Sequence, residues 1–354
     1  MAAEASATRL IRSVGQAADR RMVMRSRLTH AIVVLIVAAT VAAGAQPPAR
    51  PAHVGFLTPS SKASFESGER LINREAFRGR LRELGWIEGQ NLVIESRYAD
   101  GRYDRLRALA AELVSLPVDV IFANSAPAAL AAKRATASIP IVFETLGEPI
   151  SAGLVSSLAR PDRNLTGISG LGPELSGKRL ELLRELVPGL RGVALLVNPS
   201  NVMTEPTVRE TEKAAAILRL RVDLVEVRSP EQLESSIGSI GSDGTTAMII
   251  VPDPMLLSHA RRIHALLLKH RVPAVHTETG WLNAGALMLF GPSLVDHFRE
   301  AATLVDKVLR GARVADVPVQ QSTKFELVIN LKTAKTLGLT ISPSLLLRAD
   351  RVLE

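Results

Sequence analysis

The chain has 354 residues, of which 47% are hydrophobic, and it contains no cysteine. Its length predicts two domains or lobes with a substantial core. The lack of cysteine excludes disulfides, a thiol nucleophile and cysteine-based metal sites, and the seven histidines form no HExxH motif, so neither a metal nor a cofactor is expected. The net charge of +8 does not indicate nucleic-acid binding, because half of the excess lies in residues 1–45 and the rest is mixed with acidic side chains.

The N-terminal segment has the three regions of a secretory signal peptide. Basic residues up to Arg27 precede an apolar run at 31–43, and Ala43-Gly44-Ala45 forms an A-x-A cleavage site. The apolar run is shorter than the roughly 20 residues that span a bilayer. We therefore expect a signal peptide at 1–45, export to the periplasm with cleavage near Ala45, and a short linker at 46–52. An uncleaved anchor is the alternative, and Arg20-Arg21 leaves both the Sec and the twin-arginine routes open.

From residue 53 onward, short β-rich runs alternate with amphipathic helical stretches. This βαβαβαβ order predicts a parallel sheet covered by helices on both faces. The expected strands of the first half are 53–57, 91–99, 118–123 and 139–143, and the expected helices are 68–85, 103–116 and 127–137.

The second half repeats this order almost unit for unit, which predicts an α/β protein of two similar lobes. The expected strands are 192–198, 222–227, 246–251 and 272–280, the expected helices are 205–219, 230–239 and 255–270, and one more helix follows at 294–311.

The later segments imply that the chain crosses between the lobes more than once. We expect lobe one at 53–166 with a return segment at about 290–320, and lobe two at 167–289, while the assignment of the C-terminal segment at about 321–354 stays open. The junction carries Gly167, Gly170 and Gly172, which we interpret as a hinge because glycine allows backbone flexibility.

Two motifs suggest enzymatic chemistry but are incomplete. Residues 172–178 fit the first part of a P-loop, yet Arg179 stands where a hydroxyl should bind Mg²⁺, so the segment is better interpreted as the start of a helix. A glycosidase would need two carboxyl groups at a defined separation, which sequence cannot supply. The acids at or just past strand ends are Glu144, Glu148, Asp253 and Glu278, but no nucleophile accompanies them and no catalytic residue is assigned.

Polar residues gather instead at the carboxyl ends of the expected strands. Ligands bind at this edge of open parallel α/β sheets, near helix N-termini. Any single residue here could be a helix cap, but six such strand ends facing one cleft favour a binding site. The candidate ligand-binding residues are Thr58, Ser60, Asn124, Ser125, Thr145 and Glu148 in lobe one, and Asn198, Ser200, Asn201, Asp253 and Glu278 in lobe two.

Several segments together resemble a known family. They include "GRLRELGWIEGQNLVIESRYADGRYDRLRALAAELV", "IPIVFETLGEPISAGLVSSLARPDRNLTGIS", "KRLELLRELVP", "LLVNPSN" and the tail "QQSTKFELVINLKTAKTLGLTISPSLLLRADRVLE". The chain after residue 52 is similar to the ABC-transporter substrate-binding proteins of the TrpX-like family, whose members usually have Gly-Asp-Pro where this chain has Gly147-Glu148-Pro149. The resemblance implies a type I periplasmic-binding-protein fold, with two Rossmann-like lobes joined by three crossover segments and a ligand in the cleft.

The resemblance also implies a function and partners. The protein would capture a small solute and present it to ABC permease subunits in the inner membrane, with the ATPase as a separate subunit, and we expect a monomer that binds no nucleic acid. A sensor subunit and, less favoured, a secreted hydrolase are the alternatives. We expect an amino-acid-like ligand, because the helix after Asn124-Ser125 could receive a carboxylate while Glu148, Asp253 and Glu278 could meet an ammonium group.

Overall fold

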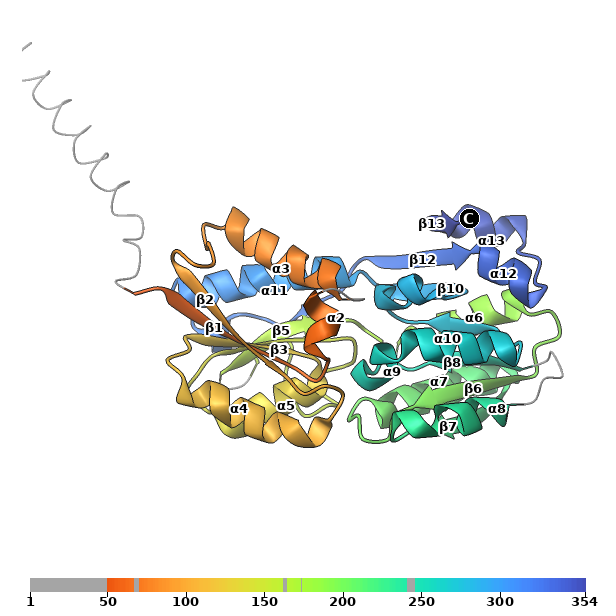
Figure 1. Cartoon of the computed structure of the whole chain (residues 1–354), viewed down its shortest axis with the longest axis horizontal. Coiled ribbons are helices and arrows are strands. Elements are labelled where there is room, and N and C mark those ends of the chain that lie inside the picture. The colour runs from red at the N-terminus through yellow and green to blue at the C-terminus, as the bar shows by residue number, and fades with distance from the viewer. Residues whose placement is uncertain (1–49, 67–69, 162–163, 173, 241–245) are drawn as a thin grey trace, which may run out of the picture. The chain divides into compact units, whose positions relative to one another are not determined.

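A computed structural model of the chain describes residues 50–66, 70–161, 164–172, 174–240 and 246–354 (Figure 1). Residues 51–354 form one compact unit. The predicted signal peptide at 1–45 and most of the predicted linker lie outside the described residues.

The first lobe is built on a parallel sheet, as the alternating pattern predicts. Among the described residues, its strand order is β11-β5-β4-β3-β1-β2, and every neighbouring pair is parallel. Strands β3, β4 and β5 are buried along their whole length because both faces of the sheet are covered. The strands are β1 (Ala52–Thr58), β2 (Leu92–Tyr98), β3 (Val120–Asn124), β4 (Ile141–Thr145), β5 (Leu165–Ser169) and β11 (Gln320–Gln321).

Two pairs of helices cover this sheet, one on each face (Figure 1). Successive side chains of a strand point to opposite faces, so Phe122 of β3 packs with one pair while Ile121 and Ala123 pack with the other. On one side lie α3 (Leu71–Glu83) and α11 (Leu294–Leu309), and on the other α4 (Leu106–Ser115) and α5 (Ala126–Ala135). The shorter helices of this lobe are α2 (Lys62–Glu66), η1 (Tyr103–Arg105) and η4 (Val314–Asp316).

The second lobe has a larger, mixed sheet. Within the described part of the chain its order is β13-β12-β10-β9-β8-β6-β7, and only β10 and β12 run antiparallel. The strands are β6 (Gly192–Val197), β7 (Arg221–Glu226), β8 (Thr246–Ile250), β9 (Ala274–His276), β10 (Met288–Pro292), β12 (Phe325–Asn330) and β13 (Arg351–Leu353). The C-terminal segment, whose place the sequence leaves open, therefore completes this sheet.

Helices also cover both faces of the second sheet. One core contains α6 (Ser176–Leu186), α7 (Thr204–Leu218), α12 (Leu331–Leu337) and α13 (Pro343–Arg348). The other contains α8 (Leu233–Gly238), α9 (Pro254–Ser258), α10 (Ala260–Lys269) and η3 (Thr279–Ala284), and η2 (Pro230–Gln232) precedes α8.

The prediction of one continuous helix at 255–270 is wrong. Two helices, α9 and α10, replace it and meet at His259, whose backbone is not helical (φ −110°, ψ 20°). The Ser258 hydroxyl donates to the Pro254 carbonyl at 2.8 Å, a bond that favours a bend in a helix.

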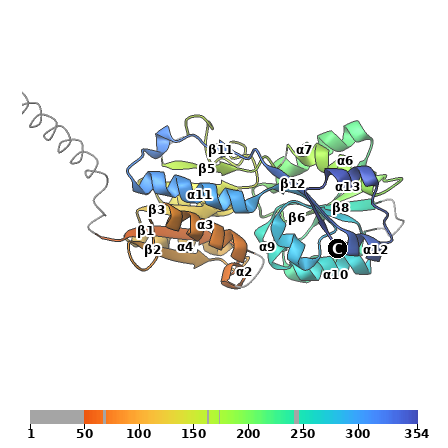
Figure 2. The same cartoon turned by 90° about the horizontal axis from the view of Figure 1, so that it is seen from above.

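The chain passes between the sheets three times: after β5, after β10 and after β11. Figure 2 shows β11 beside β5, where the chain rejoins the first sheet after leaving the second lobe. The predicted lobe boundary at residue 166 falls inside β5, so the first crossing begins after Ser169. The return segment predicted from about residue 290 begins with α11, because β10 extends to Pro292 in the second sheet.

The three candidate hinge glycines lie against lobe one. Gly167 is inside β5 opposite Phe143, and a Cβ there would overlap the Phe143 carbonyl. A Cβ at Gly170 or Gly172 would collide with the backbone of Leu146. Close backbone packing is thus a sufficient reason for these glycines, and their role as a hinge stays a prediction.

Arg179 links the first crossing to strand β10. Its guanidinium is buried and donates to the carbonyl of Gly172 at 2.7 Å and to that of Phe290 at 3.0 Å. Burial lowers its pKa to about 9, which leaves it charged at neutral pH. The residue that departs from the P-loop pattern thus holds the first crossing against strand β10.

Candidate functional site

A pocket lies between the lobes at the carboxyl ends of both sheets, where the strand-end rule predicts a ligand. Its volume is about 510 Å³, including the part open to solvent. Both lobes contribute charged or polar side chains to its lining, and Met203 and Leu146 add apolar surface. The predicted residues among the lining are Asn124, Ser125, Thr145, Asn201, Asp253 and Glu278.

The other predicted residues lie beside this pocket or away from it. Thr58 and Ser60 adjoin Asn124 through hydrogen bonds, and the Asn198 carboxamide oxygen accepts the backbone N–H of Ser200. Ser200 itself lines a separate groove outside the pocket, together with residues of α4 and α5.

Glu148 caps its own turn. Its carboxylate accepts the backbone N–H groups of Ile150 at 3.0 Å and Ser151 at 2.6 Å, and it does not contribute to the pocket lining. The helix-cap alternative therefore describes Glu148 better than contact with an ammonium group does.

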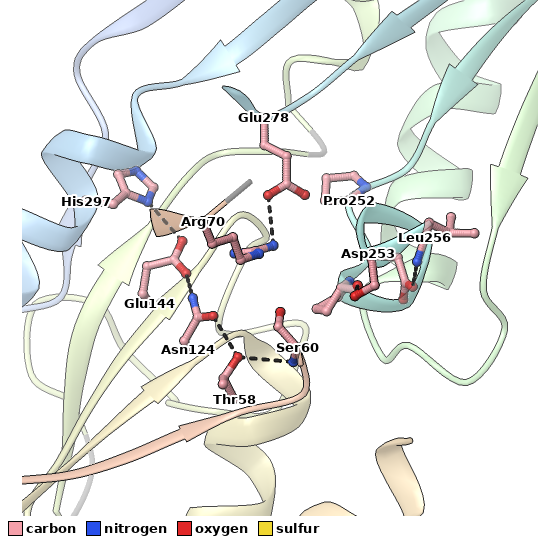
Figure 3. A network of polar contacts seen from close by, with 12 residues as sticks. Thr58, Ser60, Arg70, Asn124, Glu144, Pro252, Asp253, Leu256, Glu278 and His297 are labelled. Carbon is pink, nitrogen blue, oxygen red and sulfur yellow. Dashed lines mark hydrogen bonds and ion pairs between the residues drawn. The ribbon is translucent and has the colours of Figure 1, made fainter. Parts of the chain in front are cut away.

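The lobe-one side of the pocket is a continuous hydrogen-bond network (Figure 3). Thr58 donates to Asn124, whose amide donates to Glu144 at 2.6 Å, and the other Glu144 oxygen lies 3.0 Å from His297 Nδ1. The second ring nitrogen of His297 contacts the Ser322 hydroxyl in the third crossing. All five side chains are buried, so the network fixes the floor of the pocket and connects it to a crossing.

Asp253 has a structural position on the lobe-two side. It caps α9 by accepting the Leu256 N–H at 2.9 Å, and it also accepts the Asn201 amide at 3.0 Å and the Tyr103 hydroxyl at 2.5 Å. Burial raises the pKa of Asp253, and these hydrogen bonds oppose that shift. Because Tyr103 belongs to lobe one, its bond also joins the two lobes.

A second contact between the lobes lies within the pocket lining. Arg70, directly before α3, donates from Nη2 to Glu278 Oε2 at 2.9 Å, and the two side chains are only 5% and 1% exposed. Burial raises the pKa of Glu278 to about 6, with Arg70 opposing the shift and Glu144 and Asp253 adding to it. Figure 3 shows the Arg70 guanidinium between Glu278 and Asn124, in the gap that the two lobes enclose.

Several polar atoms here have no partner among the described residues. The buried Nε of Arg70 and the hydroxyls of Ser60 and Ser125 donate to no acceptor. Buried polar groups are normally hydrogen-bonded, so unpaired ones lining a pocket indicate where another molecule can supply the bonds.

Sequence reasoning missed Arg70, Tyr103, Met203 and His297. Tyr103 begins η1, directly after β2, so the strand-end rule could have included it, whereas Arg70 comes only after α2, just before α3. His297 carried no such signal, because it lies within an amphipathic helix whose pattern predicts only packing.

No group of three or more His, Asp or Glu side chains in the described residues could hold a metal ion. Likewise, none of the helices that the structure describes is long and apolar enough to cross a membrane.

The sequence profile of the family "ABC transporter substrate binding protein" matches residues 65–353. The chain belongs to this family. Among its relatives is a tyrosine-binding protein from Clostridioides difficile (strain R20291), which is 29% identical over 268 residues that cover 75% of this chain and 76% of the relative.

Solved structures of similar proteins support the same conclusion about the fold. A domain from Streptococcus pneumonia in complex with L-Trp is 25% identical, with a TM-score of 0.78 over 86% of this chain and 100% of that one. A conserved domain protein from Vibrio cholerae is 24% identical, with a TM-score of 0.79 over the same shares of the two chains. These likenesses confirm the α/β, two-lobe fold of type I periplasmic binding proteins.

Proposed function

We propose that this substrate-binding protein works outside the cytoplasm in an ABC import system and captures a small, amino-acid-like solute between its lobes. The observation that carries the proposal is the pocket itself, which both lobes line and which holds buried side chains of opposite charge, Arg70 and Glu278. The tyrosine-binding relative and the L-Trp complex support an amino acid as the ligand class.

The hydrogen bonds of the pocket argue for binding rather than catalysis. Glu144 is bound by Asn124 and His297, and Asp253 by three donors, so neither is placed as a poised acid or base. The hydrolase alternative therefore finds no support in the arrangement of these two acids.

The remaining elements of the proposal follow from the family. We expect the leader to be cleaved near Ala45 on export, and the loaded protein to deliver its ligand to permease subunits served by a separate ATPase. Closure around the ligand would bend the three crossings, with Gly170 and Gly172 as the candidate hinge.

Calorimetry of the purified exported protein tests the proposal. The titrants are the twenty amino acids, with glucose and ribose as uncharged controls, and small-angle scattering follows the radius of gyration at saturation. We expect one or a few amino acids to bind with a dissociation constant of about 1 µM or lower. Binding of sugars alone, or of none of the amino acids, would contradict the amino-acid assignment.

A further inference from the structure

Arg70 has donors that the protein leaves unused. Its side chain is buried, with 5% of its surface exposed. Its Nη2 donates to Glu278, and its Nε has no partner among the described residues. The ring of Phe65 lies 5.8 Å from the guanidinium carbon and closes one side. An arginine side chain has five N–H donors and no acceptor, so the missing partner must be an acceptor such as a carboxylate.

We propose that the Arg70–Glu278 ion pair recognises both charges of an α-amino acid, with Arg70 binding the ligand carboxylate and Glu278 binding the ligand ammonium group. This inference rests on the proposed function and specifies the chemistry of the same pocket.

The choice of Glu278 follows from how many donors each acid of the pocket already has. The two oxygens of Asp253 accept three hydrogen bonds, and each oxygen of Glu144 has a partner. Among the described residues, the Glu278 carboxylate accepts a hydrogen bond from one side chain, that of Arg70. A carboxylate offers about four acceptor positions, so Glu278, with one donor, keeps the most free acceptor capacity for an ammonium group.

The choice of Arg70 over the start of α5 follows from charge. Ser125 lines the pocket at the N-terminus of α5 with a buried, unpartnered hydroxyl, but this group is neutral. The guanidinium of Arg70 is charged and almost completely buried, and a bidentate bond to a carboxylate is strongest in such a buried position. The α5 terminus can add a second hydrogen bond but is not needed to explain the carboxylate.

The spacing of the pair suits a zwitterion. Nη2 of Arg70 and Oε2 of Glu278 are 2.9 Å apart, so two opposite charges lie side by side in the protein. In an α-amino acid the carboxylate and the ammonium group are attached to one carbon and are also adjacent. The two groups come from different lobes, so a ligand with both charges contacts both partners only when the lobes are closed.

Truncated ligands test this without any substitution. The probes are L-tyrosine, tyramine, which lacks the carboxylate, and 3-(4-hydroxyphenyl)propionate, which lacks the amine, with the matching set built on L-tryptophan. We expect each truncation to weaken binding to the unaltered protein by at least about a hundredfold, as expected for loss of a charge-assisted bond in a buried site.

Substitutions then assign each charge to its partner. Arg70→Gln should weaken L-tyrosine at least about a hundredfold and leave tyramine within about threefold, while Glu278→Gln should spare the propionate in the same way. Arg74→Gln is the matched control, because Arg74 lies one turn further along, inside α3, and among the described residues its side chain pairs only with Glu75. It should leave all affinities unchanged, and the melting temperature of each variant shows whether it is folded.

Three outcomes would overturn the inference, and they are distinguishable. If the unaltered protein binds amino acids but Arg70→Gln keeps its preference for tyrosine over tyramine, the proposed function stands and the assignment of Arg70 is wrong. If none of the twenty amino acids binds the unaltered protein, the proposed ligand class fails together with the inference. Equal affinity for tyrosine and tyramine in the unaltered protein would also overturn it, even if every variant fails to fold.

Discussion

Two polar contacts between the lobes each use an acidic side chain, in opposite ways. At one, Tyr103 meets Asp253, whose oxygens accept hydrogen bonds from three protein groups. At the other, Arg70 meets Glu278, where both partners keep unused bonding capacity. We therefore propose that the number of its hydrogen-bond donors, rather than its position after a strand, distinguishes an acid with a structural role from one with a binding role.

The segments after the two acids explain this difference. Asp253 is followed by Pro254 at the start of α9, and its short side chain reaches back to the Leu256 N–H as a helix cap. Glu278 precedes the 3₁₀ helix η3 and makes no side-chain cap, so its carboxylate is free to extend into the pocket. The following predictions test whether the two contacts differ as described, beginning with the largest expected effect.

Asp253→Ala should lower the free energy of unfolding by about 3 kcal/mol, because it removes a helix cap and leaves two buried donors without an acceptor. Urea unfolding monitored by circular dichroism measures the loss. In contrast, Glu278→Gln should reduce amino-acid affinity more than stability. Unchanged stability with abolished binding in Asp253→Ala would reverse the roles that we assign to the two acids.

Glu278 should make stability depend on pH. Its pKa in the folded protein is about 6, against an ordinary value of 4.5, so the folded state holds this proton more tightly than the unfolded state. The contribution of Glu278 to stability is therefore present at low pH and declines as the pH rises from 4.5 to about 6. The groups that act on its charge are Arg70, Glu144 and Asp253.

Glu278→Gln should remove this dependence. The free energy of unfolding of the variant, relative to the unaltered protein, should increase by about 2 kcal/mol between about pH 4 and about pH 7.5. Urea titrations of both proteins at a series of pH values measure the difference. A difference that does not change with pH would show that Glu278 is not perturbed in the folded state.

Tyr103→Phe removes one hydrogen bond to a buried acid and should destabilise the closed arrangement by about 1.5 kcal/mol. Because the proposed hinge lets the lobes separate without unfolding, we expect part of this loss as a larger radius of gyration in the ligand-free protein. Small-angle scattering with and without amino acid measures it. An unchanged radius in both states would show that this contact does not control closure.

Glu148→Gln should have the smallest effect. Among the described residues the carboxylate bonds only to backbone groups of its own exposed turn, so stability should change by less than about 0.5 kcal/mol and affinity should stay the same. Calorimetry with the same amino acids checks this. A clear loss of affinity would return Glu148 to the candidate ligand-binding residues.

Much of the fold could be predicted from local pattern. Apolar runs such as Ile141 to Phe143 form strands because helices cover both faces, and the strand-end rule correctly located the polar groups that line the pocket. The split at His259 was not predictable in this way, since the apolar period continues through it and only a local backbone bond interrupts the helix.

The decisive residue of the candidate site could not be predicted from pattern. Arg70 is one of several arginines in or beside α3, and nothing in their spacing marks the one that is buried. Its partner lies 208 residues further along the chain, so the pair exists only after both lobes have formed and met. Glu148 shows the opposite case, because it satisfies the strand-end rule while a local turn takes up its carboxylate.

The order in which segments enter the two sheets has a consequence for synthesis. Lobe one lacks α11 and β11 until residue 321 has been made, and lobe two lacks β12 and β13 until residue 353. The face of Phe122 that meets Phe298 of α11 therefore stays uncovered while most of the polypeptide emerges. Neither lobe can complete its core before the last tenth of the chain is available, so a polypeptide released after Pro292 would contain most of the sequence and no finished lobe.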